Sequence, residues 1–223
     1  MRVPEAKILS DSEVRNFISQ NDFESAANYL FNSQMKSWDL MRTNYDNLKH
    51  IESKSFWSGS YKLKIQFNPG RIKSTSAEVD EKSIKNRNCF LCLENLPMEQ
   101  KGILILEKFI LLCNPYPILS QHFTIASIIH EPQTILEYFS DYLIISKLLS
   151  NNTLIYNGPS CGASAPDHLH FQAGSKQIIP IENDVQQLKN ELGITVFEND
   201  KISTSFINPG KLPLLFLLPY WCG

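Results

Sequence analysis

The stretch His168-Leu169-His170-Phe171-Gln172 decides how this chain is interpreted. Side chains of a β-strand alternate between its two faces, so residues two apart share a face. The histidines and Gln172 therefore line one face, while Leu169 and Phe171 anchor the other to an apolar core. A solvated strand face is the simplest explanation of this pattern, because His and Gln are common on such faces.

The segment before this strand argues against a solvated face. Residues 157–167 read Asn-Gly-Pro-Ser-Cys-Gly-Ala-Ser-Ala-Pro-Asp. Glycines such as Gly162 and other small residues let backbone N–H groups close on an anion, and Ser160 and Ser164 add hydroxyl donors. A loop of small residues that leads directly into a strand with two histidines is suited to attack on a phosphate.

The expected chemistry follows from the side chains. A neutral imidazole attacks the α-phosphorus of a nucleotide and expels the rest as the leaving group. Its other ring nitrogen must be held as N–H, usually by a carbonyl, so that the attacking nitrogen keeps its lone pair. Gln172 can donate a hydrogen bond to a phosphate oxygen, but it cannot shuttle a proton at neutral pH. A second acceptor then takes the nucleotidyl group.

Outward from the motif, the pattern predicts an α+β class, an antiparallel sheet with helices packed on it. Strands are predicted at 61–67 with a hairpin partner at 71–77, in two pieces within 102–113, at 122–129, at 153–156 and at the histidines. Helices are predicted at 22–50 (one, or two in series), at 131–150 with Pro132 in the first turn, and at 185–192, followed by strands. Residues 79–88 and 114–117 are predicted to be irregular. We expect an N-terminal helical segment, 1–58, that covers the core of a domain at 59–223.

Composition limits the partners. The chain has 223 residues, of which 43% are hydrophobic and 20% charged, and its formal net charge is −2. It offers no basic field for nucleic acid and no cationic face for lipid, so local donors must hold an anionic ligand. The N-terminus lacks a signal-peptide pattern, and the apolar run 212–221 is too short to span a bilayer. These features predict a cytoplasmic protein without nucleic-acid or membrane partners.

Five cysteines are present, two of them as Cys89-Phe90-Leu91-Cys92. Without an export signal, this pair indicates a metal-binding or redox site before a structural disulfide. Reduced thiols in the core are the alternative, since free cysteine is often buried.

The motif resembles the HxHxQ signature of the nucleotidyltransferase branch of the histidine-triad (HIT-like) superfamily. That branch includes galactose-1-phosphate uridylyltransferase, diadenosine tetraphosphate phosphorylase and GDP-L-galactose phosphorylase. The loop 156–167 is similar to the loop before the motif in those phosphorylases. The upstream pieces 66–69, 89–92, 114–117 and 122–125 occur in the order expected for a bacterial branch of these proteins. The resemblance covers roughly residues 61–182.

The resemblance implies a HIT-like fold and a covalent nucleotidyl-histidine intermediate. His170 would be the nucleophile, with His168 beside it, and Gln172 replaces the third histidine of the superfamily's hydrolases. Ser164 and the loop at Gly162 would contact phosphate, Asn157 the phosphate or ribose, and Asn114 the nucleotide. The substrate would be a GDP-hexose or a dinucleoside polyphosphate, and the acceptor phosphate or a sugar phosphate.

The resemblance to the uridylyltransferases also implies a metal site. Their CxxC pair, a histidine at a strand end and the first histidine of HxHxQ hold a metal, and these positions are Cys89, Cys92, His130 and His168 here. The expected cofactor is zinc in a structural role, because four protein ligands leave no open position for water.

Two other functions compete with the transferase. A hydrolase of the same fold would use water as acceptor, which Gln172 disfavours. A nucleotide-binding protein without turnover is favoured by one departure from the family. The related transferases have two similar halves or a long C-terminal part, whereas this sequence ends soon after the motif. We therefore expect a C-terminally incomplete domain, or a homodimer in which a partner subunit completes the site.

Overall fold

The computed structural model describes residues 3–58, 61–67, 81–161, 163–198 and 203–207. The chain forms two compact units, residues 1–52 with 67–175 and residues 53–66 with 176–223. The domain boundary expected between residues 58 and 59 stays a prediction. None of the described helices has both the length and the apolar character needed to cross a membrane.

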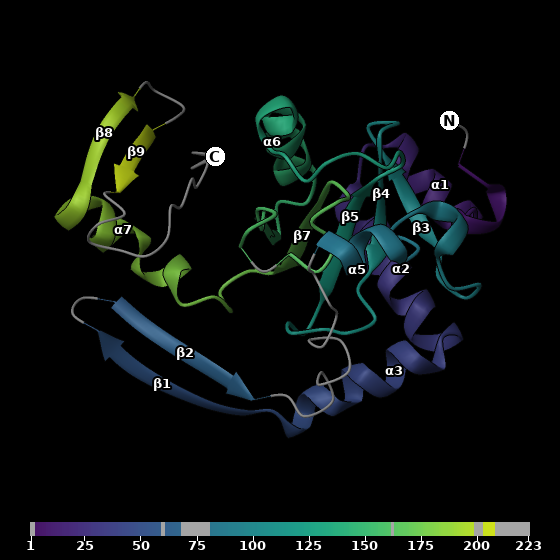
Figure 1. Ribbon diagram of the computed structural model, residues 1–223, viewed down its shortest axis with the longest axis horizontal. Coiled ribbons are helices and arrows are strands. Elements are labelled where there is room, and N and C mark those ends of the chain that lie inside the picture. The colour runs from purple at the N-terminus through teal and green to yellow at the C-terminus, as the bar shows by residue number, and fades with distance from the viewer. Residues whose placement is uncertain (1–2, 59–60, 68–80, 162, 199–202, 208–223) are drawn as a thin grey trace. The chain divides into compact units, whose positions relative to one another are not determined.

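A five-stranded antiparallel sheet forms the centre of the first unit (Figure 1). In spatial order its strands are β3 (Gly102–Ile105), β4 (Phe109–Cys113), β5 (His122–Ser127), β7 (His170–Ser175) and β6 (Asn152–Ile155). The strands expected within 102–113, at 122–129, at 153–156 and at the histidines are present, and residues 114–117 are irregular as predicted. The sheet and its helices confirm the α+β class.

The N-terminal helices bury their apolar faces against this sheet. They are α1 (Ser12–Ser19), α2 (Phe23–Ser37), α3 (Asp39–Asp46) and the short 3₁₀ helix η2 (Asn47–His50), preceded by η1 (Glu5–Lys7). Leu30 and Met41 share one core with Phe123 of the sheet. The helix predicted at 22–50 is thus two in series. Asp22 caps the start of α2, because its carboxylate accepts the Ser25 N–H at 3.0 Å. The backbone is extended at Trp38, which separates α2 from α3.

The helix predicted at 131–150 begins later than expected. A 3₁₀ turn η5 (Leu136–Tyr138) leads into α6 (Phe139–Leu148), and Pro132 lies in irregular chain. Tertiary hydrogen bonds explain the difference. The Glu131 carbonyl accepts the Leu169 N–H at 2.8 Å, and the Gln133 side chain bonds to the backbone of His170. These bonds hold 131–133 against the histidine segment, which overrides the local preference for a helix.

One further prediction is corrected. The segment predicted as loop at 79–88 contains a short helix, α5 (Glu81–Asn86), because Glu and Lys are good helix formers even where few positions are apolar. The strand predicted at 61–67 is present as β2 (Tyr61–Phe67), and it pairs with β1 (Glu52–Ser58), which precedes it. The partner predicted at 71–77 lies outside the described residues. A 3₁₀ turn η4 (Leu93–Asn95) follows the cysteine pair.

The described residues of the second unit form most of the β1–β2 hairpin, one helix and a second hairpin. The helix α7 (Ile181–Leu192) includes the predicted helix at 185–192 and begins earlier, where the Glu182 carboxylate accepts the Ile179 N–H at 3.0 Å. The strands expected after it are β8 (Gly193–Glu198) and β9 (Ser203–Ile207), which pair antiparallel.

Candidate functional site

The side chains predicted to anchor the histidine strand to the core do lie in the core. Leu169, Phe171 and Ala173 are fully buried in the core. His170 and Gln172 belong to β7, whereas His168 lies two residues before the start of the strand and not in it. His168 is nevertheless buried, and its ring faces the cysteine pair.

His170 has one ring nitrogen tied to the backbone. Its Nδ1 lies 2.8 Å from the carbonyl oxygen of His168. A carbonyl can only accept, so Nδ1 carries the hydrogen and Nε2 keeps its lone pair. No described residue forms a hydrogen bond to Nε2. Burial lowers the pKa of His170 below its ordinary value, although the His168 carbonyl raises it in part, so the ring is neutral at pH 7.

Gln133 fixes the backbone of His170, a contact that sequence reasoning missed. Its Oε1 accepts the His170 N–H at 2.8 Å, and its Nε2 donates to the carbonyls of His170 at 3.0 Å and Asn157 at 2.7 Å. The side chain is 3% exposed, so these bonds are shielded from water. Gln133 therefore joins the start of the small-residue loop to the histidine strand. No sequence signal marked it, because it lay in a predicted helix.

Gln172 is oriented by His122 from the neighbouring strand β5. The Nδ1 of His122 accepts the Ile118 N–H at 3.4 Å, which leaves the hydrogen on Nε2. That Nε2 lies 2.9 Å from Gln172 Oε1 and donates to it. This bond assigns the amide, so the NH₂ group of Gln172 is left for another acceptor. The Tyr45 hydroxyl in turn bonds the N–H and carbonyl of His122 at 3.2 and 3.1 Å.

The other predicted contact residues lie in three places. The Asn157 carbonyl is held by Gln133, and Ser164 is exposed with its carbonyl 3.4 Å from Arg87 Nη2. The side chain of Asn114 accepts the Tyr116 N–H at 2.9 Å, a bond that stabilises the turn in which Asn114 lies. It also contacts Thr124 Oγ1 at 3.4 Å, and Thr124 pairs with Gln172 in the sheet. Gly162 lies outside the described residues.

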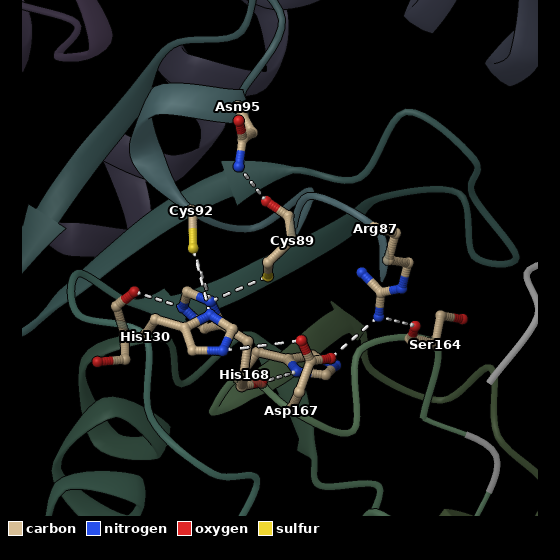
Figure 2. A network of polar contacts seen from close by, with 10 residues as sticks. Arg87, Cys89, Cys92, Asn95, His130, Ser164, Asp167 and His168 are labelled. Atoms are coloured by element: carbon tan, nitrogen blue, oxygen red, sulfur yellow. Dashed lines mark hydrogen bonds and ion pairs between the residues drawn. The ribbon is translucent and has the colours of Figure 1, made fainter. Parts of the chain in front are cut away.

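Four side chains converge beside His170. One ligand atom from each of Cys89, Cys92, His130 and His168 lies within 4.8 Å of the others (Figure 2). The His168 Nδ1 is 3.3 Å from Cys89 Sγ and 3.7 Å from Cys92 Sγ, and the His130 Nδ1 is 3.3 Å from Cys92 Sγ. In a tetrahedral zinc site the usual bond lengths place sulfur and nitrogen ligands about 3.6 Å apart. These four donors therefore fit a zinc ion.

The surroundings of the cluster also suit a cation. The outer nitrogen of His168, Nε2, lies 2.9 Å from the Ser127 carbonyl, so Nδ1 is left unprotonated toward the thiols. Burial and the neighbouring Cys89 raise the pKa of the Cys92 thiol to about 12. A bound cation would offset this and favour the thiolate. Cys113, which lies outside the pair, is a fully buried free thiol.

The fold and the site together define an α+β protein with a buried histidine on an antiparallel sheet beside a cysteine–histidine cluster. The chain belongs to the family described as Domain of unknown function (DUF4922), whose model matches residues 30–175. No curated protein matches it.

Solved structures that it resembles are those of yeast Ap4A phosphorylase Apa2. The complex with AMP is 19% identical, with a TM-score of 0.41, over 78% of this chain and 61% of the yeast chain. The complex with Ap4A is 15% identical, with a TM-score of 0.40, over 77% of this chain and 61% of that one. The chain thus spans about three fifths of the yeast enzyme.

Proposed function

We propose that this protein is a phosphorylase-type nucleotidyltransferase that carries a nucleoside monophosphate on Nε2 of His170. The observation that carries the proposal is the 2.8 Å contact between His170 Nδ1 and the His168 carbonyl. It holds the ring in the tautomer in which Nε2 is a nucleophile, and burial keeps that ring neutral.

In the first step Nε2 attacks the α-phosphorus and forms a P–N bond. The bond from phosphorus to the leaving oxygen breaks, and the leaving group departs with that electron pair. In the second step an oxygen of phosphate or of a sugar phosphate attacks the same phosphorus, and the P–N bond breaks to restore the lone pair of His170. The free NH₂ group of Gln172 is suited to donate to a phosphoryl oxygen in both steps.

Asn157 and Ser164 are the proposed contacts to the phosphate or ribose, with Gly162 in the same loop. Asn114 is the proposed contact on the nucleotide side. The loop begins at the Asn157 carbonyl, and Gln133 bonds both this carbonyl and that of His170, so Gln133 links the start of the loop to the histidine. Substrates suggested by the sequence resemblance are GDP-hexoses and dinucleoside polyphosphates.

We further propose that Cys89, Cys92, His130 and His168 hold one structural zinc ion. When bound, it would supply folding energy and not an activated water, because its four protein ligands close the coordination sphere. Its position would tie the segment after α5 to His168, two residues before the start of β7. This would support the carbonyl of His168, which is the group that sets the tautomer of His170.

The reaction is tested by a screen of GDP-hexoses and dinucleoside polyphosphates, each with and without inorganic phosphate. A phosphorylase should convert the transferred nucleoside monophosphate to a nucleoside diphosphate only where phosphate is supplied. Release of nucleoside monophosphate in plain buffer at the same rate would favour the hydrolase. Binding without any product would favour a nucleotide-binding protein without turnover.

The metal proposal predicts about one zinc per purified chain. Cys89→Ser should lower both the zinc content and the melting temperature, because structural zinc contributes directly to folding. Elemental analysis and thermal unfolding measure the two quantities. Cys161→Ser is the matched control, since Cys161 is an exposed free cysteine outside the cluster. Metal-free wild-type protein with a Cys89→Ser variant of equal stability would support the core-thiol alternative.

A further inference from the structure

Asp167 lies between the metal cluster and an arginine. Its Oδ1 accepts a hydrogen bond from Arg87 Nη2 at 3.0 Å, and its Oδ2 lies 3.7 Å from Nε2 of His130 (Figure 2). The side chains of Asp167 and Arg87 are 20% and 23% exposed, so the pair is largely shielded from solvent. Neither residue was singled out from the sequence as part of the metal site.

His130 is the cluster member that most needs an external restraint. Its side chain is 47% exposed, whereas His168 and Cys89 are buried. Its Nδ1 faces Cys92 Sγ, so Nε2 is directed to the opposite side of the ring, toward Asp167. A histidine ligand is usually fixed by an acceptor on its second nitrogen. The Ser127 carbonyl is that acceptor for His168, and the Asp167 carboxylate is in the corresponding place for His130.

Arg87 is placed to hold Asp167. Its Nη2 bonds both the Asp167 carboxylate and the Ser164 carbonyl, and its guanidinium carbon lies 5.2 Å from the centre of the Phe90 ring. Its Nε and Nη1 are buried without a partner among the described residues, so Nη2 provides the hydrogen bonds seen for this side chain. The charges also balance, since two thiolates offset Zn²⁺ and the arginine offsets the aspartate.

We propose that Asp167 is the positioning carboxylate of the metal site, that it orients the His130 imidazole, and that Arg87 acts on the metal through it. This rests on the metal part of the proposed function and is independent of the chemistry at His170. The same guanidinium holds the Ser164 carbonyl, so the metal site and the loop proposed to bind phosphate share one anchoring side chain.

The test is the zinc affinity of the full chain, measured by competition with a chromophoric chelator. Asp167→Asn keeps the shape of the side chain but removes its charge, and it should weaken zinc binding about 10–100-fold, as the loss of such partners typically does. Asp141→Asn is the matched control, because Asp141 is similarly shielded, at 14% exposed, but pairs with Lys108 and is not a member of the cluster. Its zinc affinity should equal that of the wild type.

A double-mutant cycle separates positioning from general packing. If Arg87 acts through Asp167, then Arg87→Met should also weaken zinc binding, and adding it to Asp167→Asn should cause little further loss. Wild-type affinity in Asp167→Asn would overturn the proposal, and so would fully additive losses in the double variant. A wild-type chain that binds no zinc would overturn the metal assignment as well. None of these measurements requires nucleotide, so failure of the transferase proposal is scored separately.

Discussion

Replacing His170 is expected to abolish the covalent intermediate. Wild-type protein incubated with its nucleotide substrate should gain the mass of one nucleoside monophosphate, attached through an acid-labile P–N bond to Nε2. His170→Ala should gain none, and turnover should fall by more than about a thousandfold, since the reaction loses its nucleophile. Intact-protein mass spectrometry without acid, followed by peptide mapping, measures the adduct and its position.

His170→Asn makes this test sharper. Asparagine can still donate from its amide to the His168 carbonyl, so the contact that orders the start of β7 is kept while the nucleophilic nitrogen is lost. Circular dichroism and thermal unfolding should show that the His170→Asn variant is folded, and mass spectrometry should show that it carries no adduct. His50→Ala is the control, because His50 is exposed on η2 and should label as the wild type does. Label that persists in both His170 variants would exclude this residue as the carrier.

The second large expected effect is a difference in rate between phosphate and water as acceptors of the nucleotidyl group. Glutamine cannot accept a proton at neutral pH, so water that reaches the nucleotidylated enzyme finds no general base at position 172. General acid–base help is typically worth about 10²–10⁴-fold in rate. The adduct should therefore outlive contact with water and react with an acceptor that is already ionised. Wild-type protein should release nucleotide much faster with phosphate than in plain buffer.

Gln172→His should raise the rate in plain buffer and narrow that difference, because histidine can accept and return a proton near neutral pH. Gln186→His on the exposed surface of α7 is the control and should leave both rates unchanged. Product release is followed by chromatography at several phosphate concentrations. Equal wild-type rates with and without phosphate would reject the transferase and favour the hydrolase.

Much of the fold was predictable because its signals are local. The alternation of Leu169 and Phe171 with the polar residues of the motif predicts a strand with a buried face, and both side chains lie in the core. The apolar stretches within 102–113 predict two strands, which are present and pair as β3 and β4. Strand and helix periodicities extend over a few neighbouring residues, so a sequence shows them without knowledge of the partners.

The failures occur where distant groups compete with local preference. The start of the helix predicted at 131 is irregular because Glu131 and Gln133 bond to Leu169 and His170. Local propensity favours a helix there, but buried backbone groups of the histidine segment require partners, and this segment supplies them. No pattern within 131–150 carries that information.

The sequence by itself determined the α+β class, the alternation around the histidines, the small-residue loop before them and, through its resemblance to a known superfamily, four residues expected to share a metal. The tertiary structure alone decided how these side chains are held. Gln133 bonds the backbone of His170, which lies 37 residues later in the sequence. His122 orients Gln172 at a sequence separation of 50 residues, and Cys89 contacts His168 at a separation of 79 residues. Such contacts exist only once β5 pairs with β7 and the cysteine segment packs beside them. Periodicity within one segment specifies which face is buried, but not which distant donor or acceptor will lie opposite it.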